Sequence, residues 1–281
     1  MEHKKEKQKS KSTRKSSIGS DNMKKEKNKI KFSCLMSVYK KEKVENLKLA
    51  IESILNQTLL PNEFIIIKDG PLTKELDDCL EEYKNNQIIK IIELKKNVGL
   101  GKALNEGIKY CAYEYIARMD SDDISIKDRF EKQIEYIEKN RDCDLIGGNI
   151  MEFDDITGND ISLRKVPTNL IEIKKYAKKR NPVNHVTVIF KKKSIVEVGN
   201  YQDCPYFEDY FLWIRMLIKN KKIINIDDVL VRVRAGMSMS DRRGNLQYIK
   251  HIINFEKKIY DLKYIGLINF LSNVTLRSVV V

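Results

Sequence analysis

The sequence has few of the residues that cross-link small secreted proteins or bind structural metals. Its five cysteines are odd in number and widely scattered, and no Cys-x-x-Cys pair occurs among them. This pattern argues against a disulfide framework and against a structural zinc site. It is typical of reduced cysteines in a cytosolic protein. The positions are Cys34, Cys79, Cys111, Cys143 and Cys204.

Glycine is also sparse, with 12 among 281 residues. The glycines in the segment N-V-G-L-G-K, residues 97–102, are too few and wrongly spaced for a P-loop or a dinucleotide-binding fingerprint. The N-terminal segment lacks the apolar stretch of a signal peptide. The chain contains no internal repeat. These absences exclude several common ways of binding a nucleotide.

The positive charge is concentrated at the N-terminus. The formal net charge is +13. Residues 1–29 hold eleven Lys and Arg against four Asp and Glu, so this tail carries +7 and the other 252 residues carry +6. Because the tail has almost no large apolar residues, we expect it to be a disordered basic segment. The charge leaves a basic nucleic-acid-binding protein open as one alternative. No aromatic platform accompanies the basic residues, so no specific nucleic-acid partner is expected.

Strand and helix signals alternate from Lys31 onward, and the strands are nearly continuous apolar runs. Such runs are typical of a sheet covered on both faces. The alternation predicts an α/β fold, an open and mostly parallel sheet flanked by helices. The predicted strands are Phe32–Tyr39, Phe64–Ile67, Ile88–Leu94, Tyr115–Met119 and Leu145–Phe153. In such sheets ligands bind beyond the carboxyl ends of the strands. The polar residues there are Tyr39, Asp69, Asn97 and Asp120–Asp123.

The second half of the chain is less regular. It predicts a loop and a basic helix over residues 154–182, followed by two strands and two helices. These are the strands Val186–Phe190 and Ile223–Val233 and the helices Tyr206–Lys219 and Leu246–Leu262. The apolar segment Tyr264–Val281 is open to three interpretations: a docking helix, an interfacial membrane helix or a short membrane span.

The acidic segment Asp120-Ser121-Asp122-Asp123 follows an apolar strand directly. Three carboxylates so close together repel one another unless a cation neutralises them. Hard oxygen ligands at a crevice suit Mg²⁺ or Mn²⁺. The alternative is a helix cap, in which Asp122 or Asp123 opens a helix that begins near Ile124–Ile126.

Six segments occur in an order and spacing that resemble the inverting, GT-A-type family-two glycosyltransferases. They are S-V-Y-K-K-E, I-I-I-K-D-G, N-V-G-L-G-K-A-L-N-E-G-I, I-A-R-M-D-S-D-D, N-P-V-N-H and F-E-D-Y-F-L-W-I-R. The similarity is greatest to bacterial enzymes of surface-polysaccharide assembly. It covers residues 31–250 and implies a domain over 30–250. Within it, 30–153 is the nucleotide-sugar-binding half and 154–250 the acceptor half. Residues 251–281 form a separate C-terminal helical segment, for which membrane association is one of the three interpretations given above.

The resemblance assigns residues to the donor side of the site. Ser37 and Tyr39 match positions that line the nucleotide base, and Asp69 matches an acid that accepts a hydrogen bond from a uracil-type ring. Lys102 matches a position that reaches the nucleotide or diphosphate. Each of three residues also has a structural alternative. Tyr39 could be an ordinary tyrosine at a strand end, Asp69 could serve the Asp-Gly turn, and Lys102 could be a solvated lysine at a helix start. Lys68 stands where the family often has a second Asp, so the resemblance does not decide the identity of the nucleotide base.

The resemblance also implies a metal site and a catalytic base. Asp120 and Asp122 match the acids that bind the ribose and a divalent metal, Mn²⁺ or Mg²⁺, while Asp123 caps the next helix. Asp209 matches the base that deprotonates the acceptor, although Glu208 and Asp209 would also suit an ordinary helix start. Where many members have a His near the end of the domain, this chain has Val233-Arg234-Ala235-Gly236, so a third protein ligand to the metal is not assigned. The acceptor or diphosphate side takes Asn184, His185, Glu208, Arg242 and Arg243.

The implied activity is hexosyl transfer, with inversion, from a nucleotide-diphosphate donor to a sugar or lipid-linked hydroxyl. A UDP-sugar is the expected donor. The expected context is cell-surface polysaccharide synthesis in the cytoplasm, with peripheral contact at the inner membrane surface. A metal-dependent nucleotidyltransferase is the second alternative. Its usual Gly-rich phosphate loop is missing, since Tyr39-Lys40-Lys41-Glu42 follows the first strand.

Overall fold

The computed structural model describes residues 29–235 and 246–279, and the chain from Phe32 onward forms one compact unit. Almost all of the predicted basic tail and both Arg242 and Arg243 lie outside the described residues. The strands are β1 (Phe32–Val38), β2 (Glu63–Lys68), β3 (Ile89–Glu93), β4 (Tyr115–Asp120), β5 (Ile124–Ser125), β6 (Leu145–Asp154), β7 (Asp160–Arg164), β8 (Ile189–Lys191) and β9 (Ile223–Ala235). The helices are α2 (Val44–Leu55), α3 (Lys74–Glu81), α4 (Leu100–Tyr110), α5 (Arg129–Lys139), α6 (Leu170–Tyr176), η1 (His185–Thr187), α7 (Lys192–Glu197), α8 (Glu208–Ile218), α10 (Leu246–Asp261) and α11 (Leu267–Val279).

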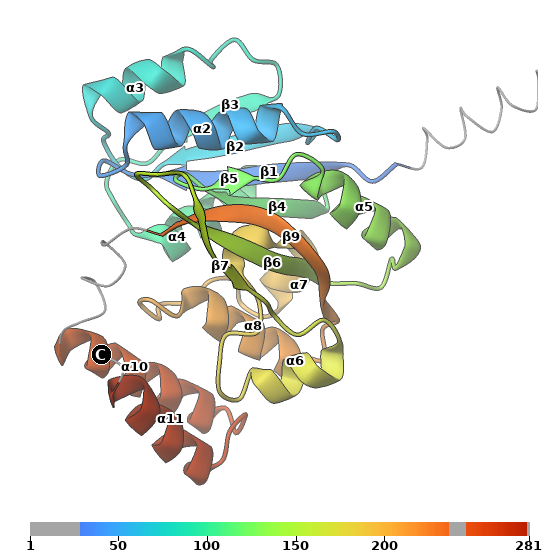
Figure 1. Cartoon of the computed structure of the whole chain (residues 1–281), viewed down its shortest axis with the longest axis vertical. Coiled ribbons are helices and arrows are strands. Elements are labelled where there is room, and N and C mark those ends of the chain that lie inside the picture. Colours follow the sequence, from blue (N-terminus) through green and yellow to red (C-terminus); the bar gives the residue numbers. More distant parts are fainter. Residues whose placement is uncertain (1–28, 236–245, 280–281) are drawn as a thin grey trace, which may run out of the picture. The chain divides into compact units, whose positions relative to one another are not determined.

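A single mixed sheet organises the unit in the order β3-β2-β1-β4-β8-β6-β9-β5, and β7 pairs with β6 (Figure 1). Strands β3, β2, β1 and β4 are mutually parallel, as the apolar runs predict. The short β8 is antiparallel to both β4 and β6. It therefore joins the parallel half to the pair formed by β6 and β9, which run parallel to each other. The predicted α/β fold is confirmed, with a more mixed second half.

Helices cover both faces of the parallel half. Helices α2 and α3 lie on one side and α4 on the other (Figure 1). The α4 side packs Leu35 of β1 and Ile67 of β2 against Leu104. Gly107 permits this close approach, since a Cβ at that position would lie 2.4 Å from Leu35 Cδ1. The side chains that alternate along each strand thus pack the sheet against the helices. Because β1, β2 and β4 are parallel, their carboxyl ends lie at the same edge of the sheet.

Three local predictions were wrong. The segment Val186–Phe190 is not one strand, because Thr187 turns the chain into η1 by donating its backbone N–H and its hydroxyl to the Asn184 carbonyl. Strand β7 lies where a loop was predicted; it is fully exposed, although Ile161 and Leu163 alternate with polar residues along it. Asp123 caps no helix, because the next residues form β5, paired with β9, and α5 begins only at Arg129.

The C-terminal helices α10 and α11 pack against each other. Helix α10 continues across residues 250–251, where the domain boundary was placed. No helix among the described residues is long and apolar enough to cross a membrane.

Candidate active site

A cleft of about 1560 Å³ joins the carboxyl end of β4 to the start of α8 and to α11. Most of the predicted metal, base and acceptor residues that the structure describes line this one cleft. They are Asp120, Asp122, Asn184, His185, Glu208 and Asp209. These residues come from three separate stretches of the chain, so the fold, and not sequence proximity, brings them together.

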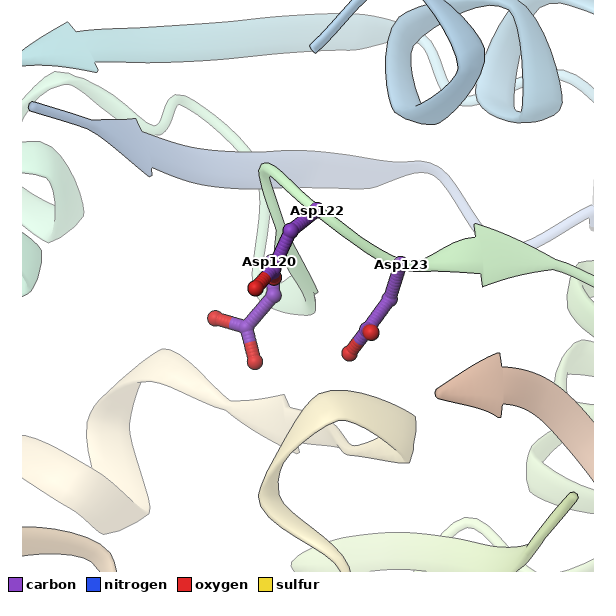
Figure 2. Close-up of side chains that lie close together, drawn as sticks. All are labelled: Asp120, Asp122 and Asp123. Atoms are coloured by element: carbon purple, nitrogen blue, oxygen red, sulfur yellow. The ribbon is translucent and has the colours of Figure 1, made fainter. Parts of the chain in front are cut away.

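The acidic cluster sits between β4 and β5 (Figure 2). Asp120 is the last residue of β4 and pairs in register with Ser37 of β1. One carboxylate oxygen from each of Asp120, Asp122 and Asp123 lies within 4.8 Å of the others. Figure 2 shows the three side chains extending to the same side of the segment. This geometry presents a set of converging oxygen ligands.

The carboxylates of the cluster disfavour one another's charge. Burial, together with the nearby carboxylates of Asp120 and Glu42, raises the pKa of Asp122 to about 7. Burial, together with the carboxylates of Asp122 and Asp120, raises the pKa of Asp123 well above its ordinary value. A hard divalent cation prefers such oxygen donors and would relieve the repulsion. The residues present therefore fit a divalent metal, with oxygen donors from Asp120 and Asp122 as predicted and from Asp123 in addition.

Two arginines flank the cluster, and neither was predicted as a site residue. The buried Arg118 forms an ion pair with Asp120 through Nη2, and its Nε has no partner. Arg234 donates its backbone N–H to Asp123 Oδ1 at 2.9 Å and its Nε to the Asp122 carbonyl at 3.0 Å. A guanidinium cannot ligate a cation, so the role of Arg234 that these contacts support is to orient the acidic segment.

The stability of the protein should depend on pH through this cluster when no divalent cation is present. A carboxyl whose folded pKa is raised keeps a proton that the unfolded chain has already lost. For Asp122 that window runs from its ordinary value of 3.8 to about 7. We therefore expect the free energy of unfolding to fall as pH rises through this window, and Asp122→Asn to lessen the fall.

Chemical denaturation at several pH values in EDTA measures this effect. The matched control is Asp261→Asn, which removes an exposed carboxylate of α10 that pairs with Lys257. Adding Mn²⁺ should restore more stability at pH 8 than at pH 5, because the cation competes with protons for the same oxygens. Equal pH dependence in Asp122→Asn and in the unaltered protein would show that the cluster does not titrate in this way.

The first turn of α8 brings two more carboxylates to the cleft. Burial raises the pKa of Asp209, whose Oδ2 accepts a hydrogen bond of 2.7 Å from Asn181 Nδ2. Burial, reinforced by Asp209, raises the pKa of Glu208 to about 7. The positive charge of Arg118 partly opposes the effect of burial on the pKa of both Asp209 and Asp122. Its guanidinium is thus within electrostatic reach of the acidic cluster and of the start of α8.

The acceptor-side residues are held by polar contacts. Asn184 donates Nδ2 to the Gly148 carbonyl at 2.9 Å, while its buried Oδ1 has no partner. His185 Nε2 lies 2.7 Å from the Tyr201 hydroxyl, and burial lowers the pKa of His185 well below its ordinary value. The imidazole is therefore neutral. Trp213 is fully buried beside it and belongs to the core.

Of the residues predicted for the nucleotide side, Asp120 lines the cleft, whereas Ser37, Tyr39, Asp69 and Lys102 do not. Asp69 is buried after β2 and accepts hydrogen bonds from Val98 N, Gly99 N and Asn97 Nδ2. Tyr39 is exposed after β1. Lys102 lines a smaller depression on α4, although its neighbour Gly101 lines the cleft. Ser37 lies beside Asp120 in the sheet, whereas Lys102 lines the smaller depression and not the cleft.

The sequence carried signals for several residues that were missed. Arg118 is a charge inside an apolar strand, two residues before Asp120, so both side chains fall on the same face. Asn181 is the first residue of the segment N-P-V-N-H. Tyr201 and Arg234 have no comparable local signal, because only the tertiary fold brings them to the site.

The mixed sheet and the strand-end acidic cluster define a GT-A-type glycosyltransferase. Glycosyl transferase family 2 matches residues 33–197. The amylovoran biosynthesis glycosyltransferase AmsE of Erwinia amylovora is 40% identical over 237 residues, which are 84% of this chain and 88% of the relative. An Escherichia coli UDP-Gal:alpha-D-GlcNAc-diphosphoundecaprenol beta-1,3-galactosyltransferase is 37% identical over 247 residues, 88% of this chain and 90% of the relative.

Solved structures share the fold. S. aureus TarS residues 1–349 in complex with UDP-GlcNAc superimposes with a TM-score of 0.63 at 18% identity, over 82% of this chain and 66% of that one. The mannosyltransferase PcManGT from Pyrobaculum calidifontis in complex with GDP-Man and Mn²⁺ gives 0.62 at 11% identity, over 87% and 68%. The chain belongs to glycosyl transferase family 2. Family membership decides against the nucleotidyltransferase and nucleic-acid-binding alternatives.

Proposed function

We propose that the protein transfers a hexose from a UDP-sugar to a hydroxyl of a lipid-linked glycan, with inversion, in the synthesis of a cell-surface polysaccharide. The observation that carries this proposal is the single cleft that joins the acidic cluster to Asp209. The E. coli relative is named for UDP-Gal and a diphosphoundecaprenol acceptor, and AmsE for amylovoran biosynthesis. Both names support the proposed donor and acceptor classes.

The donor nucleotide is assigned to the edge formed by β1, β2 and β4. The exposed ring of Tyr39 is free to stack on a base. The Asp69 carboxylate accepts three hydrogen bonds from residues 97–99 and retains capacity for one from a uracil N–H. Ser37 lies beside Asp120 in the sheet. Lys102 would have to turn toward the cleft to contact the diphosphate.

Asp120 and Asp122 are the proposed ligands of a divalent metal, Mn²⁺ or Mg²⁺. When bound, such an ion neutralises the acidic cluster and the departing diphosphate. The chain contributes the alignment of these acids, because the ion pair with Arg118 positions Asp120 and Arg234 fixes the segment that bears Asp122.

Asp209 is the proposed catalytic base. An inverting transfer is one displacement at the anomeric carbon, so it needs a carboxylate that accepts the acceptor's proton and no covalent nucleophile. Asn181 holds the Asp209 carboxylate, and burial brings its pKa closer to neutral. As the acceptor oxygen bonds to the anomeric carbon, its proton passes to Asp209 and the bond to the diphosphate breaks.

The acceptor subsite is assigned to Asn184, His185 and Glu208, with Arg242 and Arg243 kept as diphosphate candidates from the sequence alone. The unpartnered Asn184 Oδ1 suits a sugar hydroxyl donor. The cleft beyond them is basic, with Arg164, Lys179 and Arg180 in its wall. These cations suit the diphosphate of a lipid-linked acceptor, and we place the reaction at the cytoplasmic face of the membrane.

A thermal-stability panel tests the donor class. We expect UDP and one UDP-sugar, but not GDP or CDP, to raise the melting temperature in Mn²⁺ and not in EDTA. A ligand at about 100 times its dissociation constant adds about 2.7 kcal/mol to the folded state. A shift with GDP alone would overturn the uridine assignment. No shift with any nucleotide, in folded protein, would overturn the proposed donor site.

A further inference from the structure

The outward face of α11 is apolar. Within α11, Leu267 is 56% exposed, Ile268 84%, Leu271 56%, Leu276 64% and Val279 80%. At 100° per residue these five fall in one half of the helix. The same half holds three hydroxyl residues, Ser272, Thr275 and Ser278, but no charged side chain. In a chain that is 33% charged, so large an uncharged exposed face indicates a binding surface.

The opposite half of α11 faces the protein and mixes apolar and polar side chains, with Phe270 packed against the core beside Asn273 and Arg277. Asn273 donates to the Lys178 carbonyl at 2.8 Å and to Glu256 Oε2 at 3.0 Å. Arg277 donates to the Lys179 carbonyl at 2.9 Å, and its Nε lies 3.2 Å from Glu256 Oε1. A surface helix normally buries its apolar side and exposes its polar side. In α11 the exposed half is also apolar, whereas the polar Asn273 and the charged Arg277 face the protein.

Basic side chains flank the apolar face. Five of the seven residues from Lys174 to Arg180 are Lys or Arg, and most of these cations are exposed. Within the described part of the chain, none of them forms an ion pair with a carboxylate. The hydrogen bonds of Asn273 and Arg277 to the backbone of this segment place it directly beside α11. Lys263, in the turn before α11, adds a further exposed cation.

An apolar helical face bordered by cations matches the surface of an anionic bilayer. A second copy of the chain fits poorly, because a symmetric contact through this face would bring two basic segments together. The 13 residues of α11 extend about 20 Å, less than the ~30 Å of a hydrocarbon core. Such a helix lies along the interface and does not cross it.

We propose that the outward face of α11 and residues 174–180 form a surface that docks on an anionic membrane. The proposal rests on the proposed function, since docking would present the cleft to a lipid-linked acceptor. Lys179, Arg180, Leu276 and Arg277 border both this surface and the basic end of the cleft. The acceptor diphosphate thus enters beside the helix, while its lipid remains in the bilayer.

Vesicle flotation of the full chain tests the surface. We expect binding to phosphatidylglycerol-containing vesicles and little binding to pure phosphatidylcholine. The double variant Ile268→Ser/Leu271→Ser should weaken binding at least about tenfold, because two apolar side chains lose their burial. The matched control is Ile156→Ser/Ile161→Ser, which removes one exposed isoleucine from the β6–β7 turn and one from β7. This control should bind the vesicles normally. The basic N-terminal segment is present in every variant, so its contribution cancels.

Two further measurements keep the docking surface and the proposed function separate. The double variant should keep the UDP-dependent thermal shift and transfer to a water-soluble acceptor, and lose transfer to an acceptor embedded in vesicles. Vesicle binding that is equal in the double variant and the unaltered chain overturns the docking surface. So does a dimer that dissociates on the same substitutions. Failure of the thermal shift and of soluble transfer in the unaltered chain overturns the proposed function instead.

Discussion

Replacing Asp209 with Asn is expected to lower kcat by about 10²- to 10⁴-fold, the usual contribution of a positioned general base. The substitution keeps the shape of the side chain and removes its ability to take a proton. Asp209 lies at the start of α8, apart from the acidic cluster. The affinity for the donor, measured by calorimetry in Mn²⁺, should therefore change little.

The pH profile identifies the base more sharply. Burial raises the pKa of Asp209, so activity should be lost, as pH falls, at a higher pH than for an ordinary aspartate. Glu208, with a pKa of about 7, is the competing candidate. Glu208→Gln should keep the acidic limb of the profile if Asp209 is the base. Asp203→Asn, at an exposed position nearby, serves as the control. Unchanged turnover in Asp209→Asn would show that the assignment is wrong.

Replacing Asp122 with Ala should abolish metal-dependent donor binding. In the unaltered protein, Mn²⁺ and UDP together should raise the melting temperature, and this gain should disappear in the variant. The same substitution should stabilise the metal-free protein at pH 8, because it removes one of several carboxylates that repel each other. The two effects have opposite signs, so general damage to the fold cannot produce both.

The control for Asp122→Ala is Asp261→Ala, which removes an exposed carboxylate far along the chain in α10. It should preserve the gain from Mn²⁺ and UDP. Differential scanning calorimetry with and without EDTA measures both variants. A full metal-dependent gain in Asp122→Ala would show that the acidic cluster does not hold the ion.

The parallel half of the fold was predictable because its strands are buried on both faces. Runs such as Phe32–Val38 have no competing interpretation, and the acids at their carboxyl ends must share an edge. The same logic located Asp120 and Asp122. It failed at Asp123, because the two-residue strand β5 depends on pairing with β9, more than 100 residues away. No local sequence pattern predicts the pairing of β5 with β9.

The cleft itself was predictable only in part. The resemblance supplied Asp209 and Asn184-His185, and the structure brings them into one cleft with the acidic cluster. The sequence alone did not predict that Arg234 contacts the acidic cluster, because its position follows from the register between β6 and β9. The sequence also did not predict which side of α11 faces solvent. An apolar segment has the same composition whether it packs on the core or is exposed. The orientation follows from the contacts that Asn273 and Arg277 make with Glu256.

The most direct test of the central claim is a transfer assay with the full chain, Mn²⁺, a UDP-hexose panel and a synthetic sugar–diphosphate–lipid acceptor. We expect one UDP-hexose to yield a glycosylated lipid whose new linkage has the opposite anomeric configuration to the donor. EDTA or Asp209→Asn should stop the reaction. A retained configuration, or full transfer in both EDTA and the variant, would show that the protein is not a metal-dependent inverting transferase with Asp209 as its base.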